Sequence, residues 1–146
     1  MKSDDAVNPI FLDSSALLAW IYNEPGGEEV ERALTRAESK GKTLSTAQAS
    51  LAEISHSLGM ANRAAYPQRL GAIRSAPIYW IPLTDEDAIA AGLLRLDFKM
   101  SFADALIITL ARRLGSEFWH KDPEFDQLPS DFLKVHRLPY KSLKGS

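Results

Sequence analysis

Short apolar runs alternate along this chain with longer segments whose apolar residues recur at helical spacing. The short runs are typical of buried strands, and they lie at residues 10–12, 43–45, 78–81, 118–119 and 134–138. The longer segments predict helices at residues 15–22, 28–40, 47–60, 64–75, 84–96 and 101–114. This alternation implies right-handed crossovers, and therefore a three-layer α/β/α fold around a central, mostly parallel sheet.

Several ends of these elements are marked by residues with strong local preferences. Pro77 and Pro82 flank the third strand, and Gly115 follows the helix at 101–114. The run from Thr84 to Asp87 has the pattern of a capping box. The 146 residues contain no repeat and no linker, so we expect one domain over residues 1–146 with its core at about 10–138.

Composition narrows the chemistry that this domain can carry. Hydrophobic residues make up 45% of the chain, enough for an ordinary core, and cysteine is absent. Its absence excludes thiolate catalysis and cysteine-ligated metal sites, and it suits a reducing compartment. The N-terminus has no signal-peptide pattern and no apolar stretch reaches ~20 residues, so we expect a cytoplasmic protein with no membrane partner. The net charge of −2 argues against a bulk nucleic-acid coat.

Four acidic residues recur at the junctions between the predicted elements. Asp13 and Asp122 come directly after predicted strands, Glu53 lies in the helix after the second strand, and Asp104 lies in the first turn of a largely apolar helix. In a parallel α/β sheet, chemistry gathers beyond the carboxyl ends of the strands. We therefore expect these four carboxylates to face one edge of the sheet.

Such a cluster has a definite chemistry. Ligand sets made only of oxygen select hard cations such as Mg²⁺ or Mn²⁺. Ions held by carboxylates can polarise a phosphodiester, lower the pKa of a water and stabilise the departing oxyanion. In the absence of metal, the carboxylates repel one another, and at least one should hold a proton near neutral pH.

Each acid also has a purely structural interpretation. Asp13 could cap the helix that begins near Ser15, Asp104 could complete a capping box with Ser101, and Asp122 could cap a turn that starts with proline. Glu53 could face solvent. The histidines show no metal-ligand spacing: a helix surface is the simplest place for His56, and His120 could touch the site or lie in a surface turn.

Four segments of the chain resemble the acidic motifs of PIN-domain ribonucleases, and above all those of the VapC-type toxins of bacterial toxin–antitoxin pairs. The segments are FLDSSALL at 11–18, LAEI at 51–54, SFADAL at 101–106 and DPEF at 122–125. The resemblance runs from about Ile10 to Leu128 in similar element order. It implies a PIN-like fold and a Mg²⁺-dependent endoribonuclease acting on structured RNA, with Mn²⁺ able to replace Mg²⁺.

The resemblance also implies roles for individual residues. Asp13 and Asp104 would be the principal metal ligands, Glu53 would help to hold the metal and its water, and Asp122 would complete the cluster. The family usually has Thr or Ser two places before the fourth acid, where this chain has His120. This histidine could instead donate a hydrogen bond to Asp122 or to RNA.

The partners implied by the resemblance are the RNA substrate, a VapB-type antitoxin whose tail enters the active-site groove, and a second copy of the chain. We expect the homodimer to use the helices at 47–60 and 64–75, whose apolar residues exceed what a small sheet can cover. These residues are Leu58, Met60, Tyr66, Leu70 and Ile73. Lys99, Arg112 and Arg113 could contact RNA phosphates.

Two other functions compete with the nuclease. One is a catalytically degenerate PIN-like module that grips RNA or protein without cleaving it. The other is an aspartyl-phosphate phosphatase, which needs a second aspartate two residues after the nucleophile, where this chain has Ser15.

Overall fold

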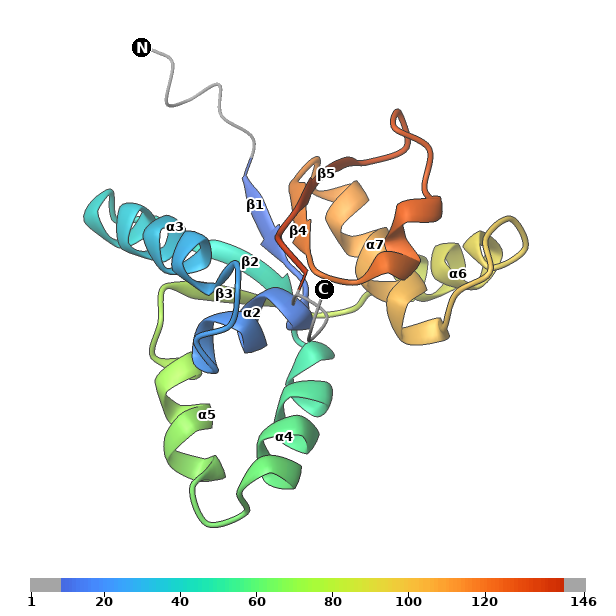
Figure 1. The fold of residues 1–146 in the computed structure, drawn as a ribbon. Coiled ribbons are helices and arrows are strands. Elements are labelled where there is room, and N and C mark those ends of the chain that lie inside the picture. The colour runs from blue at the N-terminus through green and yellow to red at the C-terminus, as the bar shows by residue number, and fades with distance from the viewer. Residues whose placement is uncertain (1–8, 141–146) are drawn as a thin grey trace, which may run out of the picture.

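Five parallel strands form one sheet in the order β3-β2-β1-β4-β5 (Figure 1). The computed structural model describes residues 9–140 of the chain. The strands are β1 (Ile10–Leu12), β2 (Leu44–Ala47), β3 (Ile78–Ile81), β4 (Glu117–His120) and β5 (Lys134–Arg137). The central strands β1 and β4 are each paired on both sides, so their carboxyl ends are the natural place for a site.

Six α-helices and one 3-10 helix connect these strands within residues 9–140. They are α2 (Ser14–Ile21), α3 (Gly27–Ser39), α4 (Ser50–Ala61), α5 (Tyr66–Arg74), α6 (Asp85–Leu94), α7 (Phe102–Arg113) and the 3-10 helix η1 (Pro123–Gln127). No helix in this part of the chain combines the length and the apolar character that crossing a membrane requires.

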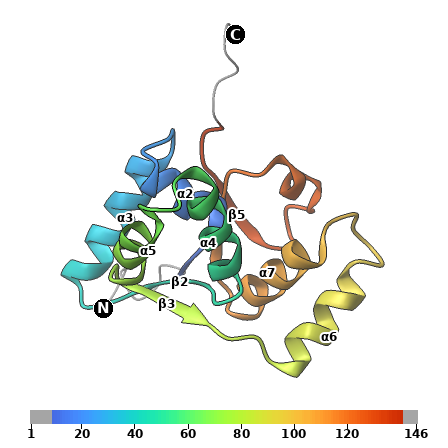
Figure 2. The ribbon, with the colours of Figure 1, turned by 90° about the horizontal axis from the view of Figure 1, so that it is seen from below.

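The two faces of the sheet are covered by different helices. Leu12 and Trp119 pack with apolar residues of α2, α3, α4 and α5, whereas Phe11 and Phe118 pack with residues of α7 and η1. Successive residues of a strand point to opposite faces, which explains why neighbours in β1 and β4 belong to different clusters. Figures 1 and 2 show helices on both sides of the sheet, so the predicted α/β/α fold with a parallel sheet is confirmed.

The second strand is longer than the sequence predicted. β2 continues to Ala47, which pairs with Ile81 of β3, and the next residue, Gln48, donates its N–H to the Ile81 carbonyl at 2.9 Å. The helix α4 therefore begins at Ser50 rather than at residue 47. A local pattern could not locate this boundary, because it is set by pairing with a strand more than thirty residues away.

The argument for a homodimer through α4 and α5 is wrong in its premise. Leu58 and Ile73 are fully buried in the chain's own core, and Tyr66 and Leu70 pack against the same cluster. These two helices cover each other and α2, so only Met60 of the expected apolar set is largely exposed. The large exposed apolar side chains gather elsewhere, on and after α6.

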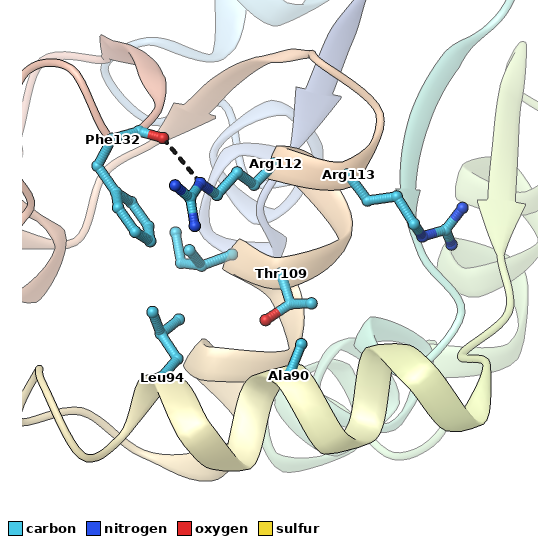
Figure 3. Close-up of a pocket in the computed structure, with 7 residues that line it drawn as sticks. Ala90, Leu94, Thr109, Arg112, Arg113 and Phe132 are labelled. Atoms are coloured by element: carbon cyan, nitrogen blue, oxygen red, sulfur yellow. Dashed lines mark hydrogen bonds between the residues drawn. The ribbon is translucent and has the colours of Figure 1, made fainter.

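The helix α6 lies on the outer side of α7 (Figure 2). Between them is an open pocket of about 320 Å³, lined by Ala90 and Leu94 of α6 and by Thr109 and Arg112 of α7, with Phe132 at its end (Figure 3). Arg112 donates from Nε to the Phe132 carbonyl at 3.2 Å and its guanidinium lies over the Phe132 ring. Arg113 points the other way and pairs with Asp87 of α6 at 2.7 Å.

Candidate metal centre

Asp13 stands where β1 passes into α2. Its N–H donates to the Trp119 carbonyl at 3.0 Å, which extends the pairing of β1 with β4 by one residue. Its carboxylate caps α2 by accepting the Ser15 amide at 3.1 Å and the Ser15 hydroxyl at 2.5 Å. The side chain is only 4% exposed. The capping interpretation therefore holds for Asp13, but capping alone does not require a carboxylate to be this deeply buried.

Ser15 joins the ends of the two central strands. Besides its bond to Asp13, its hydroxyl oxygen accepts the Lys121 amide at 3.0 Å. Lys121 follows β4 directly and precedes Asp122. The acid after β1 and the acid after β4 are thus held in one hydrogen-bonded frame.

Asp122 caps the 3-10 helix η1, as the Asp-Pro sequence suggested. Its Oδ1 accepts the Glu124 amide at 2.9 Å, and Pro123 occupies the first helical position. Its own N–H donates to Nδ1 of His120 at 3.0 Å. Both the backbone and the side chain of this half-buried acid are therefore fixed.

Asp104 projects from the first turn of α7. Its N–H is capped by the Ser101 hydroxyl at 3.0 Å, but no return bond from the Asp104 carboxylate to the Ser101 amide occurs within residues 9–140. Only half of the expected capping box is formed, whereas Thr84 and Asp87 form a complete one at the start of α6. The Asp104 carboxylate is half-buried and turns instead towards the other acids.

The structure brings three carboxylates together, and one of them is a residue that the sequence did not single out. Asp104, Asp122 and Glu124 each offer an oxygen within 4.8 Å of the others. Glu124 belongs to the DPEF segment, and the tight turn of η1 brings it beside the residue that caps it. The signal was present in the sequence, because an N-capping Asp before proline predicts such a turn.

Burial, together with repulsion between the carboxylates, raises the pKa values of Asp13 and Asp104. Burial raises the pKa of Asp13 to about 6, with Glu53 and Asp122 adding repulsion against the bonds from Ser15. Burial, a hydrogen bond with Glu124 and the charges of Asp13, Asp122 and Glu124 together raise the pKa of Asp104 to about 8. These shifts fit the expectation that at least one carboxylate is protonated near neutral pH.

Glu53 stands apart from the three-carboxylate group. It lies in the first turn of α4 and is exposed, as its structural interpretation required. Its charge nevertheless raises the pKa of Asp13, so α4 directs it to the same side of the sheet. Asp13 likewise lies outside the group of three but acts electrostatically on Asp104.

The interpretation of His120 as a surface residue is wrong. It is the last residue of β4 and is fully buried. Its Nδ1 accepts the Asp122 amide, so the bond between them runs opposite to the donation to Asp122 that the sequence suggested. Burial lowers the pKa of this histidine, which keeps the ring neutral. Sequence alone could not place it, because a single histidine after two aromatic residues has no distinctive spacing.

The donor set suits a hard divalent cation. The cluster offers only carboxylate oxygens, and no Lys or Arg forms an ion pair with Asp13, Asp104, Asp122 or Glu124 in the described part of the chain. Nearby Lys121 is engaged elsewhere, with the Pro25 carbonyl at 2.7 Å and with Glu24. Uncompensated carboxylates in partly buried positions require protons or a metal ion, and oxygen ligands favour Mg²⁺ or Mn²⁺.

Comparison with known proteins places this arrangement in context. The sequence model of the PIN domain matches residues 10–130. A chain in the crystal structure of VapBC2 from Rickettsia felis, bound to a DNA fragment from their promoter, has a similar fold. Its TM-score is 0.70 at 16% identity, covering 89% of this chain and 98% of that one. A chain of a toxin–antitoxin complex from Klebsiella pneumoniae is similar at a TM-score of 0.64 and 18% identity, covering 87% and 95%. No curated protein matches this sequence.

Identities this low show a shared fold and nothing finer. The PIN-domain match, by contrast, spans most of the chain and includes all four acids predicted from the sequence as well as Glu124. Of these residues, Asp104, Asp122 and Glu124 come together, and Asp13 follows the carboxyl end of β1. The chain therefore belongs to the PIN-domain family.

Proposed function

We propose that this protein is a Mg²⁺-dependent endoribonuclease toxin that cleaves structured RNA and is neutralised by a VapB-type antitoxin. The observation that carries the proposal is the group formed by Asp104, Asp122 and Glu124 beside Asp13, at the edge of the sheet where α/β proteins bind ligands. The PIN-domain match and the likeness in fold to chains of toxin–antitoxin complexes support it.

The residues have distinct tasks in this proposal. When bound, Mg²⁺ would supply positive charge against the negative charge that develops on the phosphate and on the leaving oxygen. Asp13, Asp104 and Asp122 would hold it, with Glu124 as a further oxygen donor. Because its pKa is raised to about 8, the Asp104 carboxyl group holds a proton at neutral pH and must release it before the metal binds. Glu53, exposed on α4 and close enough to act on the charge of Asp13, would orient the attacking water.

Of the three basic residues expected to hold the RNA backbone, two are engaged in contacts within the chain. Arg113 is paired with Asp87, and Arg112 is bonded to the Phe132 carbonyl, both at the α6–α7 contact. Lys99 is exposed, and its backbone is tied to Gln127 of η1 by bonds of 3.2 and 2.9 Å. Lys99 is therefore the residue of the three that we assign to the RNA backbone.

A groove beside the acids suits the antitoxin tail. An open pocket of about 330 Å³ is lined by Ser15 and Leu18 of α2, by Tyr22 just after it, by Ser57 of α4 and by Lys121. Ser15 is bonded directly to Asp13, so the pocket adjoins the acidic site. An antitoxin segment with one apolar side chain and a neighbouring Arg or Lys would fill this pocket and neutralise the carboxylates together.

We propose that the homodimer forms through α6 instead of α4 and α5. Exposed apolar residues recur along its outer side and continue past its end: Ile89 (64% exposed), Leu93 (59%), Leu96 (79%) and Phe102 (63%). The first turn of α6 is acidic, at Asp85 and Glu86, whereas Arg95 follows its last turn. Because Arg95 donates from Nε to the Met100 carbonyl at 2.7 Å and lies over the Phe102 ring, the exposed apolar residues carry this proposal and the charges do not. Two copies related by a twofold axis would bury these apolar residues against each other.

Cleavage of RNA by antitoxin-free protein tests the proposed activity. Total cellular RNA is incubated with wild type, Asp13→Asn and the control Asp131→Asn, which alters an exposed acid outside the cluster. We expect cleavage with Mg²⁺ or Mn²⁺, none with EDTA, a loss of orders of magnitude in Asp13→Asn, and no loss in the control. Cleavage should weaken with salt. If no RNA is cleaved with any metal while Mn²⁺ still binds, the nuclease is wrong and a binding module replaces it.

A further inference from the structure

A buried imidazole holds the backbone of the fourth acid. His120 is fully buried at the end of β4, and its Nδ1 lies 3.0 Å from the Asp122 nitrogen. Because a backbone N–H can only donate, Nδ1 must be the acceptor, and the neutral ring carries its hydrogen on Nε2. The tautomer of His120 is therefore fixed by the Asp122 amide.

Packing fixes the orientation of this ring. The ring stacks on Phe118 with centroids 5.6 Å apart and an angle of 22° between the planes. Phe125 of η1 meets it edge-on, at 5.1 Å and 76°. The His120 carbonyl accepts the Leu138 amide at 2.8 Å, which anchors the backbone from the β5 side. The acceptor for Asp122 is thus held by rigid neighbours on several sides.

An imidazole is not the side chain that packing alone would favour at this place. Nε2 is buried and has no hydrogen-bond partner among residues 9–140, although it carries the hydrogen of the neutral ring. A buried donor without an acceptor destabilises the fold. A phenyl ring would make the same aromatic contacts without this penalty. The feature that only the imidazole supplies is the acceptor at Nδ1.

The bond acts on the group of three carboxylates. Asp122 is held through its N–H by His120 and through its Oδ1 by the Glu124 amide. Glu124 in turn has a carboxylate oxygen within 4.8 Å of an oxygen of Asp104. Rotation of the Asp122 peptide would displace two of the three oxygens that approach within 4.8 Å.

We propose that His120 is a positioning residue, which fixes the Asp122 peptide so that the carboxylates of Asp122 and Glu124 face Asp104 in the geometry that a cation requires. This inference rests on the metal-dependent function proposed above. His120 itself does not touch the reacting atoms.

Two variants separate positioning from packing. His120→Asn removes the ring but keeps an acceptor that can bond the amide two residues on, as Asn does in Asx-turns. His120→Phe keeps the ring but removes the acceptor. Each protein is assayed for its urea midpoint, for hydrogen exchange of the Asp122 amide in EDTA, and for Mn²⁺ affinity by calorimetry.

A positioning role and a purely structural role predict opposite rankings of the two variants in Mn²⁺ affinity. We expect His120→Phe to match or exceed the wild-type urea midpoint, yet to exchange the Asp122 amide at least tenfold faster and to bind Mn²⁺ about 10–100-fold more weakly. We expect His120→Asn to have a lower midpoint, yet to keep the slow exchange and a Mn²⁺ affinity within about threefold of wild type. A purely structural role would instead make Mn²⁺ affinity follow the midpoint.

The outcomes also separate this inference from the proposed function. Equal exchange of the Asp122 amide in wild type and His120→Phe overturns the positioning role, whatever the metal does. Equal loss of Mn²⁺ affinity in both variants overturns it as well. If wild type binds no Mn²⁺ while its Asp122 amide is protected and His120→Phe loses that protection, the metal-dependent function fails and the hold of His120 on Asp122 stands.

Discussion

The Ser15 hydroxyl lies 2.5 Å from Oδ2 of Asp13, and it is the only side chain in the described part of the chain that donates a hydrogen bond to this buried carboxylate. The bond favours the charged form of Asp13, but burial outweighs it and raises the pKa to about 6. The folded protein therefore keeps Asp13 in an environment that opposes its ionisation. This conflict leads to a prediction about stability.

Without metal, the free energy of unfolding should fall as the pH rises from 4 to 8. The pKa of Asp13 is about 6 in the fold against an ordinary 3.8, so between these values the native state binds more protons than the unfolded state. Asp13 accounts for a loss of about 3 kcal/mol by pH 7. Asp104, with its pKa of about 8, also lowers the free energy of unfolding and extends the fall to about pH 8. Urea unfolding in EDTA at pH 4.5, 6 and 8 measures it.

The variant Asp13→Asn serves as the control for this prediction. Its amide cannot ionise and can still accept the Ser15 amide, so the part of the fall that Asp13 causes should disappear, and the fall that remains between pH 4.5 and 8 should be that of Asp104. At pH 8 the variant should be at least as stable as wild type. A wild type that becomes more stable across this range would show that Asp13 is not held against ionisation.

Bound Mn²⁺ should displace a proton from Asp104. Its pKa of about 8 means that a cation and a proton compete for the carboxylate at neutral pH. We expect the apparent affinity to rise about tenfold or more from pH 6 to pH 8. Asp104→Asn should bind at least tenfold more weakly at pH 8 and lose most of this dependence. Calorimetry in buffers of different ionisation enthalpy counts the released protons. A pH-independent affinity in wild type would remove Asp104 from the site.

The sequence was sufficient for the architecture and for part of the site. Asp13 and Asp122 could be placed because each lies within two residues of the end of a short apolar strand, and parallel strands deliver such residues to one edge. Glu124 and His120 were missed for different reasons. Glu124 depends on the tight turn of η1, a short local geometry, whereas the role of His120 depends on burial between Phe118 and Phe125.

The overestimated apolar surface of α4 and α5 has a different cause. The apolar residues of α4 and α5 were counted correctly, but a sequence does not show that the two helices cover each other. The sequence predicted a helix at 84–96, but it did not show which side of this helix α7 would cover. Only tertiary packing leaves the outer side of α6 without cover, because α7 contacts the opposite side.

The ion pair between Asp87 and Arg113 should be a major stabilising contact of α6. Arg113 donates to both carboxylate oxygens of Asp87, at 2.7 and 2.9 Å, and Asp87 is 2% exposed. Arg113→Met leaves the Asp87 carboxylate with the Thr84 amide but no cation, and because Arg113 is half exposed it should reduce the free energy of unfolding by about 1–2 kcal/mol at pH 7. Arg112→Met, its exposed neighbour, should cost under about 1 kcal/mol. Urea unfolding compares them.

Acid should remove the contribution of this pair. Arg113 lowers the pKa of Asp87 below its ordinary 3.8, so the pair contributes fully above that pH and is lost as the pH falls towards the folded pKa. The gap between wild type and Arg113→Met should therefore narrow below pH 4. An unchanged gap at pH 3, with both proteins folded, would show that the loss arises from packing of the Arg113 stem.

We expect the homodimer to form through the exposed apolar residues on and after α6. Leu93→Glu on α6 and Leu96→Glu just after it each put a charge into this surface, where a second copy would have to bury it without a partner. The matched control is Met60→Glu, which alters an equally exposed apolar residue (76%) on α4, the helix first expected at the interface. In sedimentation at tens of micromolar, we expect a dimer for wild type and Met60→Glu and a monomer for the α6 variants. All four should have similar urea midpoints, because these side chains are exposed within one chain. A monomeric Met60→Glu beside dimeric α6 variants would return the interface to α4, and a monomeric wild type would contradict the homodimer.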